Sequence, residues 1–221
     1  MVSTQHDFLL VHIPKTAGNA IQNVLRDYSE AVIDTSSEEA DGKDRFGVTD
    51  VEYGTTKHST LSEYHAAIEP EVYEGLFKFA VVRNPWDRMI SAYFSPHRGD
   101  VEWDPGAFAQ FVRSEPPLRH YVDTMDVRGR IARQVARLFP EVARAIKPLD
   151  ADLDFVIRFE QLSEDFERAC RKIGISPEPL PVRNQSKRGH YSTYYTPALR
   201  ELVREQFAEE IQFAGFTFGD E

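Results

Sequence analysis

Cysteine, basic charge and long apolar runs are all scarce in this chain of 221 residues, and each scarcity excludes a class of protein. Cys170 is the only cysteine, so an intrachain disulfide is excluded, and nothing in the chain resembles a zinc framework. Lysine and arginine total 26 against 36 acidic residues. The resulting net charge of −10 argues against nucleic-acid binding and against adhesion to an anionic membrane. The apolar run Phe8–Ile13 is too short to span a bilayer.

The N-terminal residues Met1–Asp7 lack the basic region and the small-residue cleavage site of a signal peptide. We therefore expect no membrane span and a cytoplasmic location, although a chain from which an anchor had been removed would have the same composition. With 41% hydrophobic residues the chain can bury a substantial core, and its length favours a single domain over residues 1–221. The sequence does not indicate an oligomeric state.

Strand-like runs alternate with helical patterns along the chain. The runs Phe8–Ile13, Phe77–Val82 and Asp154–Phe159 are typical of buried strands in a parallel sheet. This alternation predicts an α/β fold of three layers around a central, mainly parallel sheet. The sequence also predicts a short strand at Ala31–Ile33, a long loop over 34–57, and helices at Ile21–Tyr28, Leu61–Ile68, Pro85–Phe94, 106–114, 127–139, Leu162–Lys172 and Pro197–Ile211.

The segment Phe8–Asn19 is the most informative, because an apolar strand ends in Pro-Lys-Thr-Ala-Gly and a helical pattern begins at once. A lysine, a hydroxyl and backbone N–H groups therefore meet at a helix N-terminus, which suits a phosphate or sulfate group. A P-loop for ATP or GTP would read G-x-x-x-x-G-K-[ST]. Here Leu9 and Pro14 occupy the two glycine positions, and Gly18 follows Lys15 instead.

A second candidate anion site follows the predicted strand Phe77–Val82. Arg83 ends this strand and can hold a phosphate with two parallel N–H groups, and Ser91 lies two turns into the next helix. Arg88 lies on the intervening turn and is expected to support the site. Because ligands of such sheets bind beyond the carboxyl ends of the strands, we expect Lys15 and Arg83 to share one site.

Together these motifs resemble those of the carbohydrate sulfotransferases, which include membrane-anchored heparan and chondroitin/dermatan enzymes and bacterial homologues. His12–Gly18 is similar to the loop that binds the 5′-phosphosulfate in that family. Val81–Tyr93 is similar to its 3′-phosphate motif, R-[DN]-P-x-x-R-x-x-S-x-Y. Ile157–Leu162 and Asn184–Ser186 resemble later landmarks, so the resemblance extends over most of the chain.

The resemblance implies a P-loop nucleotide-kinase-like fold and 3′-phosphoadenosine-5′-phosphosulfate (PAPS) as the co-substrate. Asn19 stands where relatives usually have threonine or serine, so its backbone N–H is the group expected to serve. By position, the 5′-phosphosulfate would lie on Lys15, Thr16, Ala17, Gly18 and Asn19, the 3′-phosphate on Arg83 and Ser91, and a late loop that closes on the nucleotide would supply Lys187 and Arg188.

Sulfuryl transfer to an alcohol needs a base for the hydroxyl proton, and an imidazole suits that task. His58 matches the position of a Lys-His-Ser/Thr segment in many relatives. We predict an in-line displacement in which His58 accepts the proton and Lys15 stabilises the transferring group, without a metal ion. The alternatives are Glu63, because some relatives use a carboxylate, and the histidines His12, which is expected to be buried, His65, His97, His120 and His190.

Two other functions stay open: an ATP-dependent P-loop-like kinase, and a non-catalytic nucleotide- or glycan-binding module. The missing glycines argue against the first, and the retained Lys15, Arg83, Ser91 and His58 argue against the second. The resemblance favours a saccharide or glycoconjugate acceptor, with small alcohols, lipid-linked sugars and tyrosine as alternatives. A polyanionic glycan would require a basic groove from Arg113, Arg119, Arg128, Arg130, Arg133 and Arg137, which we interpret instead as solvated helix faces.

Overall fold

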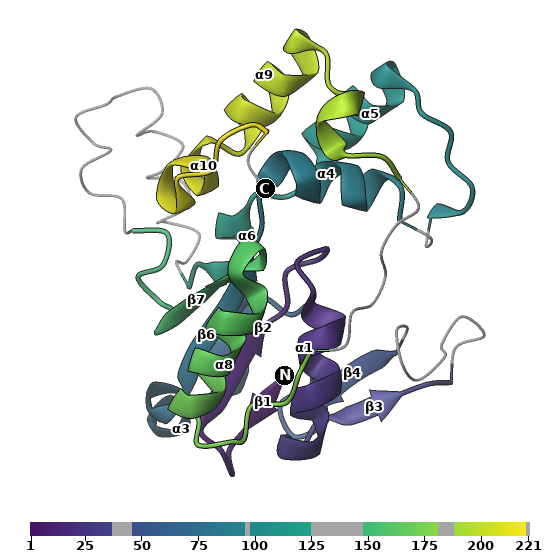
Figure 1. Cartoon of the computed structure of the whole chain (residues 1–221). Helices are drawn as coiled ribbons and strands as arrows, with labels where there is room; N and C mark the ends of the chain where they lie inside the picture. Colours follow the sequence, from purple (N-terminus) through teal and green to yellow (C-terminus); the bar gives the residue numbers. More distant parts are fainter. Residues whose placement is uncertain (37–45, 96–97, 125–147, 181–187, 220–221) are drawn as a thin grey trace.

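The computed structural model describes residues 1–36, 46–95, 98–124, 148–180 and 188–219 (Figure 1). A sheet of order β1-β2-β6-β7 lies at the centre of this described part. Strands β2, β6 and β7 are parallel, and β1 pairs antiparallel with β2. The prediction of a mainly parallel central sheet is therefore confirmed. The strands are β1 (Val2–Ser3), β2 (Phe8–Val11), β6 (Phe77–Val82) and β7 (Phe155–Arg158).

Helices cover both faces of this sheet, which confirms the predicted three layers. Successive strand residues point to opposite faces, so Leu10 is buried with helices α1 and α8, whereas Leu9 is buried with α2 and α4. Because both faces are covered, β2 and the carboxyl half of β6 are apolar throughout. These helices are α1 (Gly18–Leu25), α2 (Leu61–Ala67), α4 (Pro85–Tyr93) and α8 (Leu162–Lys172).

A second group of helices packs around α4, beyond the end of the sheet (Figure 1). Its core is aromatic: Tyr93 of α4 makes edge-to-face contacts with Trp103, Phe108 and Phe111. This packing fixes α4 between the sheet and the outer helices. The helices against α4 are α5 (Pro105–Ser114), the 3₁₀ helix Tyr191–Tyr194 and α9 (Pro197–Gln206). Helix α10 (Ala208–Ala214) packs against α9, and α6 (Leu118–Val122) packs against α2.

The prediction of a loop over 34–57 is wrong in its second half. Strands β3 (Val32–Asp34), β4 (Gly47–Asp50) and β5 (Thr55–Thr56) form a separate antiparallel sheet. The strand predicted at Ala31–Ile33 is confirmed with a shift of one residue. Strands β4 and β5 are only a few residues long and contain Gly, Asp and Thr, so the sequence shows no clear alternation there.

The helix predicted from Pro197 to Ile211 is interrupted. Phe207 is buried with φ −116° and ψ 29°, which separates α9 from α10. Two short helices, α3 (Pro70–Gly75) and α6, were not predicted. The helix predicted over 127–139 lies outside the described residues, and a single domain over 1–221 stays a prediction.

Candidate active site

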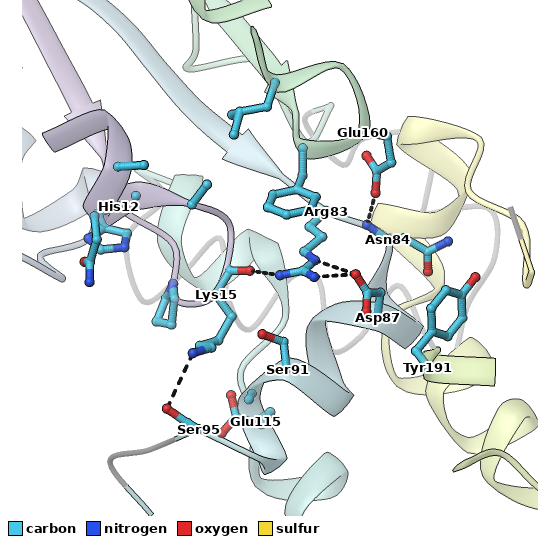
Figure 2. Close-up of a pocket in the computed structure, with 18 of the residues that line it drawn as sticks. His12, Lys15, Arg83, Asn84, Asp87, Ser91, Ser95, Glu115, Glu160 and Tyr191 are labelled. Atoms are coloured by element: carbon cyan, nitrogen blue, oxygen red, sulfur yellow. Dashed lines mark hydrogen bonds and ion pairs between the residues drawn. The ribbon is translucent and has the colours of Figure 1, made fainter. Parts of the chain in front are cut away.

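A cavity of about 1210 Å³ lies at the carboxyl ends of β2 and β6. The loop between β2 and α1 and helix α4 bound it (Figure 2), and Arg188 also lines it. The two predicted anion motifs thus share one cavity, as the parallel sheet requires. The sequence-predicted residues that line it are Lys15, Ala17, Gly18, Asn19, His58, Arg83, Ser91 and Arg188.

The loop between β2 and α1 turns sharply. Lys15 and Ala17 both have φ 69°, a left-handed conformation that brings the chain from the strand into the helix. The Thr16 hydroxyl donates to the carbonyl of Ile13 at 2.8 Å, and the residue is buried. The Thr16 side chain therefore braces the loop and does not line the cavity, which leaves its backbone N–H as the group for an anion.

Gly18 is required here by space. A Cβ atom at this position would lie 2.0 Å from Cδ2 of His12, a buried ring directly beneath the loop. Burial is the main cause that lowers the pKa of His12 well below its usual value, followed by the charge of His58. His12 therefore stays neutral and supports the loop from below, as its predicted burial implied.

Lys15 extends from this loop across the cavity toward α4. Its ammonium nitrogen lies 3.5 Å from Oγ of Ser95 (Figure 2). Burial lowers the pKa of Lys15, and the positive charges of Arg83 and Arg188 lower it further. Three cationic side chains thus act on one another within this cavity, which favours the binding of an anion with more than one charge.

Arg83 connects the two anion motifs directly. Its Nη1 donates to the backbone carbonyl of Lys15 at 2.9 Å, and its Nε donates to Oδ2 of Asp87 at 2.8 Å. Its Nη2 also donates to that oxygen, and the guanidinium lies over the Phe159 ring with its carbon 3.9 Å from the centroid. Burial lowers the pKa of Arg83, an effect that Asp87 opposes.

Ser91 and Arg188 complete this side of the cavity. Ser91 lies on α4 one turn after Asp87 and faces the cavity (Figure 2). Arg188 donates through Nη2 to Oδ1 of Asp87, the carboxyl oxygen that Arg83 does not use. Lys187, which the sequence paired with Arg188, lies outside the described residues.

His58 belongs to a wall of the cavity beside His12, in the segment between β5 and α2. The residue is exposed, and its ring centroid lies 4.7 Å from that of His12. Its Nδ1 lies 3.4 Å from the His12 carbonyl oxygen. His12 therefore contacts both Gly18 of the anion loop and His58, so that the loop and the candidate base are supported by the same buried ring.

Lys57 is a further cation of this wall. Its ammonium donates to the carbonyl of Phe46 at 2.7 Å and lies 4.4 Å from the centre of the Phe46 ring. Burial lowers the pKa of Lys57 to about 8.

The expectation that Arg88 supports the anion site is wrong. Its side chain is only 2% exposed and points into the outer helices, where Nη2 lies 3.4 Å from Oε1 of Glu210. Its guanidinium also lies over the Phe207 ring. The turn of α4 that places Asp87 and Ser91 on the cavity directs Arg88 away from it, because Arg88 follows Asp87 directly and adjacent residues of a helix do not face the same way.

The remaining candidates from the sequence are an acidic residue, several arginines and the alternative histidines. Glu63 closes a capping box with Thr60 at the start of α2 and does not line the cavity. Arg119 pairs with Glu209, and Arg113 is exposed outside the cavity. Among the alternative histidines, His12 and His190 line the cavity, His65 and His120 do not, and His97 lies outside the described residues. Arg128, Arg130, Arg133 and Arg137 also lie outside the described residues.

Several cavity residues were missed by the sequence analysis. Asp87 and Glu160 line the cavity near Arg83 and Asn84 (Figure 2), and Glu160 accepts a hydrogen bond from the backbone N–H of Asn84 at 2.7 Å. Ser95, Arg98 and Glu115 also line the cavity. Asp87 carried a usable signal, because it follows Arg83 by four residues on the start of a helix. The others come from distant elements and carried none.

Within the described ranges, no group of three or more His, Cys, Asp or Glu side chains is arranged to hold a metal ion. The same part of the chain contains no helix with the length and apolar character needed to cross a membrane.

The similarity of this chain to known proteins is at the level of the family. A family model described as "Sulfotransferase family" matches residues 1–213. A protein of Archaeoglobus fulgidus, described as "Uncharacterized protein", is 27% identical to this chain over 113 residues. The aligned part is 51% of this chain and 79% of that protein. No solved structure gave a significant match.

Proposed function

The chain belongs to the sulfotransferase family, and on that premise we propose that it transfers the sulfuryl group of PAPS to a hydroxyl group of a saccharide. The observation that carries the proposal is the hydrogen bond between Arg83 and the carbonyl of Lys15. It ties the Arg83 guanidinium to the backbone of the loop that carries Lys15, so two motifs that each supply a cationic side chain are held next to each other. A nucleotide with phosphate groups on both its 3′ and 5′ oxygens has a matching pair of anions.

In this proposal the 5′-phosphosulfate lies on Lys15 and on the backbone N–H groups that follow, from Thr16 to Asn19. The first N–H groups of a helix have no partner within the helix and favour an anion. Arg83, Ser91 and Arg188 hold the 3′-phosphate, and Lys187 is proposed with them from its neighbouring position in the sequence. The Phe159 ring, which already lies against Arg83, forms an apolar surface beside the nucleotide.

The reaction follows from this placement. The acceptor oxygen attacks sulfur, the bond between sulfur and the bridging phosphate oxygen breaks, and adenosine 3′,5′-bisphosphate leaves. His58 receives the hydroxyl proton, for which its exposed position on the cavity wall is suitable. Lys15 stabilises the negative charge that develops on the bridging oxygen and on the sulfuryl group.

The part of the cavity lined by Phe111, Tyr121 and Glu115 supports a saccharide as the acceptor. Aromatic walls with a few polar groups are typical of small-molecule sites, and a carboxylate accepts hydrogen bonds from sugar hydroxyls. Burial raises the pKa of Glu115, although the charges of Arg88 and Arg98 oppose this.

A cytoplasmic location is proposed on the sequence evidence alone.

Calorimetric titration tests the donor part of the proposal. We expect adenosine 3′,5′-bisphosphate to bind at least about tenfold more tightly than either AMP or ATP with Mg²⁺, because only the bisphosphate engages both anion sites. Tighter binding of ATP would favour a kinase and contradict the proposal. Labelled PAPS with a panel of neutral and acidic saccharides, small alcohols and tyrosine peptides then tests transfer. Bisphosphate binding without transfer to any acceptor would favour the non-catalytic module.

A further inference from the structure

The carboxylate of Asp87 receives two arginines that come from distant parts of the chain. Arg83 donates to Oδ2 through Nε and Nη2, and Arg188, 101 residues further along than Asp87, donates to Oδ1 through Nη2. The side chains of Arg83 and Arg188 are each 11% exposed, and that of Asp87 is 18% exposed. Both carboxyl oxygens are therefore used to hold guanidinium groups at the edge of the cavity.

The contacts with Asp87 and Lys15 use three N–H groups of the Arg83 guanidinium and leave two. A guanidinium has five N–H groups. Two donate to Asp87 and one donates to the carbonyl of Lys15. One N–H on each terminal nitrogen is left, and Phe159 covers one face of the plane. A pair of N–H groups on the two terminal nitrogens is the arrangement that binds a phosphate through two parallel hydrogen bonds.

The charges of Arg83 and Arg188 also require Asp87. Two guanidinium groups that face one cavity repel each other and also repel the Lys15 ammonium. Burial is the larger cause that lowers the pKa of Lys15, and the charges of Arg83 and Arg188 lower it further. Asp87 offsets one of the two guanidinium charges and holds the pair together. One positive charge is then left over on this three-residue cluster, with Lys15 adding a second at the neighbouring site.

We propose that Asp87 is the positioning residue that makes the site select a 3′-phosphate, because it turns two N–H groups of Arg83 toward the phosphate and keeps Arg188 beside it. This inference rests on the proposed function and concerns the same donor site. The competing explanation is purely structural: Asp87 lies in the first turn of α4, where an acidic residue stabilises a helix, and it pairs with a residue four positions before it.

The ratio of two affinities separates these explanations. Adenosine 3′,5′-bisphosphate and AMP differ only in the 3′-phosphate, so their affinity ratio reports that contact and is insensitive to partial unfolding. We expect Asp87→Asn to lower this ratio about tenfold or more while the affinity for AMP stays within about threefold. Asp87→Glu keeps the charge on a longer side chain and should restore part of the ratio. If Asp87→Asn does not fold, Asp87→Glu is measured in its place: its ratio should still fall below that of wild type, and a wild-type ratio would overturn the inference.

Asp165→Asn is the matched control. Asp165 also lies in the first turn of a helix, α8, and pairs with an arginine, Arg168, outside the cavity. This variant should lower the melting temperature and leave the affinity ratio unchanged. A ratio within about threefold of wild type in Asp87→Asn, together with a collapsed ratio in Arg83→Ala, would overturn the inference. A wild-type protein that does not prefer the bisphosphate to AMP would instead contradict the proposed function, and the inference would fall with it.

Discussion

Arg83 donates a hydrogen bond to the backbone carbonyl of Lys15 at 2.9 Å, across 68 residues of sequence. A side chain at the end of β6 thereby fixes the loop that follows β2. The two loops are neighbours because β2 and β6 pair in parallel, with Val11 opposite Ala80. The two proposed anion sites are therefore parts of one rigid unit, which leads to the first prediction.

Arg83→Lys should weaken the binding of adenosine 3′,5′-bisphosphate about tenfold or more, because an ammonium cannot donate to Asp87, to the Lys15 carbonyl and to a phosphate in fixed directions at once. AMP should lose less affinity, because Arg83 supports its 5′-phosphate site only indirectly, through the Lys15 carbonyl. Titration calorimetry measures both. Arg113→Lys, on the exposed face of α5, is the control and should change neither affinity. Equal losses for AMP and the bisphosphate would contradict a role at the 3′-phosphate.

Gly18→Ala should destabilise the protein by about 1–3 kcal/mol, because the added Cβ would overlap the His12 ring at 2.0 Å. In a His12→Ala background the same change should cost much less, since the ring is gone. Urea unfolding of the four proteins gives this coupling. Gly75→Ala is the matched control, because a Cβ at Gly75 would meet no atom within 4 Å. Similar costs of Gly18→Ala in both backgrounds would show that the ring is not the obstacle.

His58→Ala should lower kcat about 10²–10⁴-fold, the usual contribution of a positioned acid–base group. Bisphosphate affinity should stay within about threefold, because His58 is proposed to act on the acceptor proton only. The measurement is turnover of labelled PAPS with whichever acceptor the screen identifies. His65→Ala, an exposed histidine of α2 outside the cavity, should retain full turnover. Near-wild-type turnover in His58→Ala would remove His58 as the base.

Arg88→Met should destabilise the fold by about 3–5 kcal/mol, because it leaves the Glu210 carboxylate buried without its cation. The double variant Arg88→Met/Glu210→Gln should recover part of this loss. Urea unfolding compares the stability of the single and the double variant. The folded fraction of each variant should bind adenosine 3′,5′-bisphosphate as tightly as wild type does. A selective loss of bisphosphate affinity without loss of stability would place Arg88 in the donor site after all.

The unfolding free energy of wild type relative to Lys57→Met should rise between about pH 8 and pH 10. The folded pKa of Lys57 is about 8 because of burial, whereas an unfolded lysine has a pKa of about 10.4. Between these values the unfolded chain binds a proton that the folded chain does not, so stability increases with pH. Tyr64 and Tyr195, whose pKa burial raises, are present in both proteins and cancel in the comparison. A constant difference across this range would contradict the lowered pKa.

The sequence alone determined the elements whose signal is local. The strand at Phe77–Val82 and the helix at Leu162–Lys172 were predicted at the bounds that the structure has. The placement of Lys15 and Arg83 at one sheet edge was predicted as well, because strands of a parallel sheet end on the same side. In each case a continuous apolar run or helical spacing was visible within about ten residues.

Only the tertiary structure decided which side chains converge. Strand β4 could not be predicted because its pairing with β3 and β5, and not its own short pattern, forms it. Arg88 and Asp87 are adjacent in sequence, yet α4 packs so that Arg88 is buried against Glu210 and Asp87 faces the cavity. Arg188 reaches Asp87 from 101 residues away. A sequence pattern specifies the face of an element, whereas the partner of that face depends on how elements distant in the chain pack together.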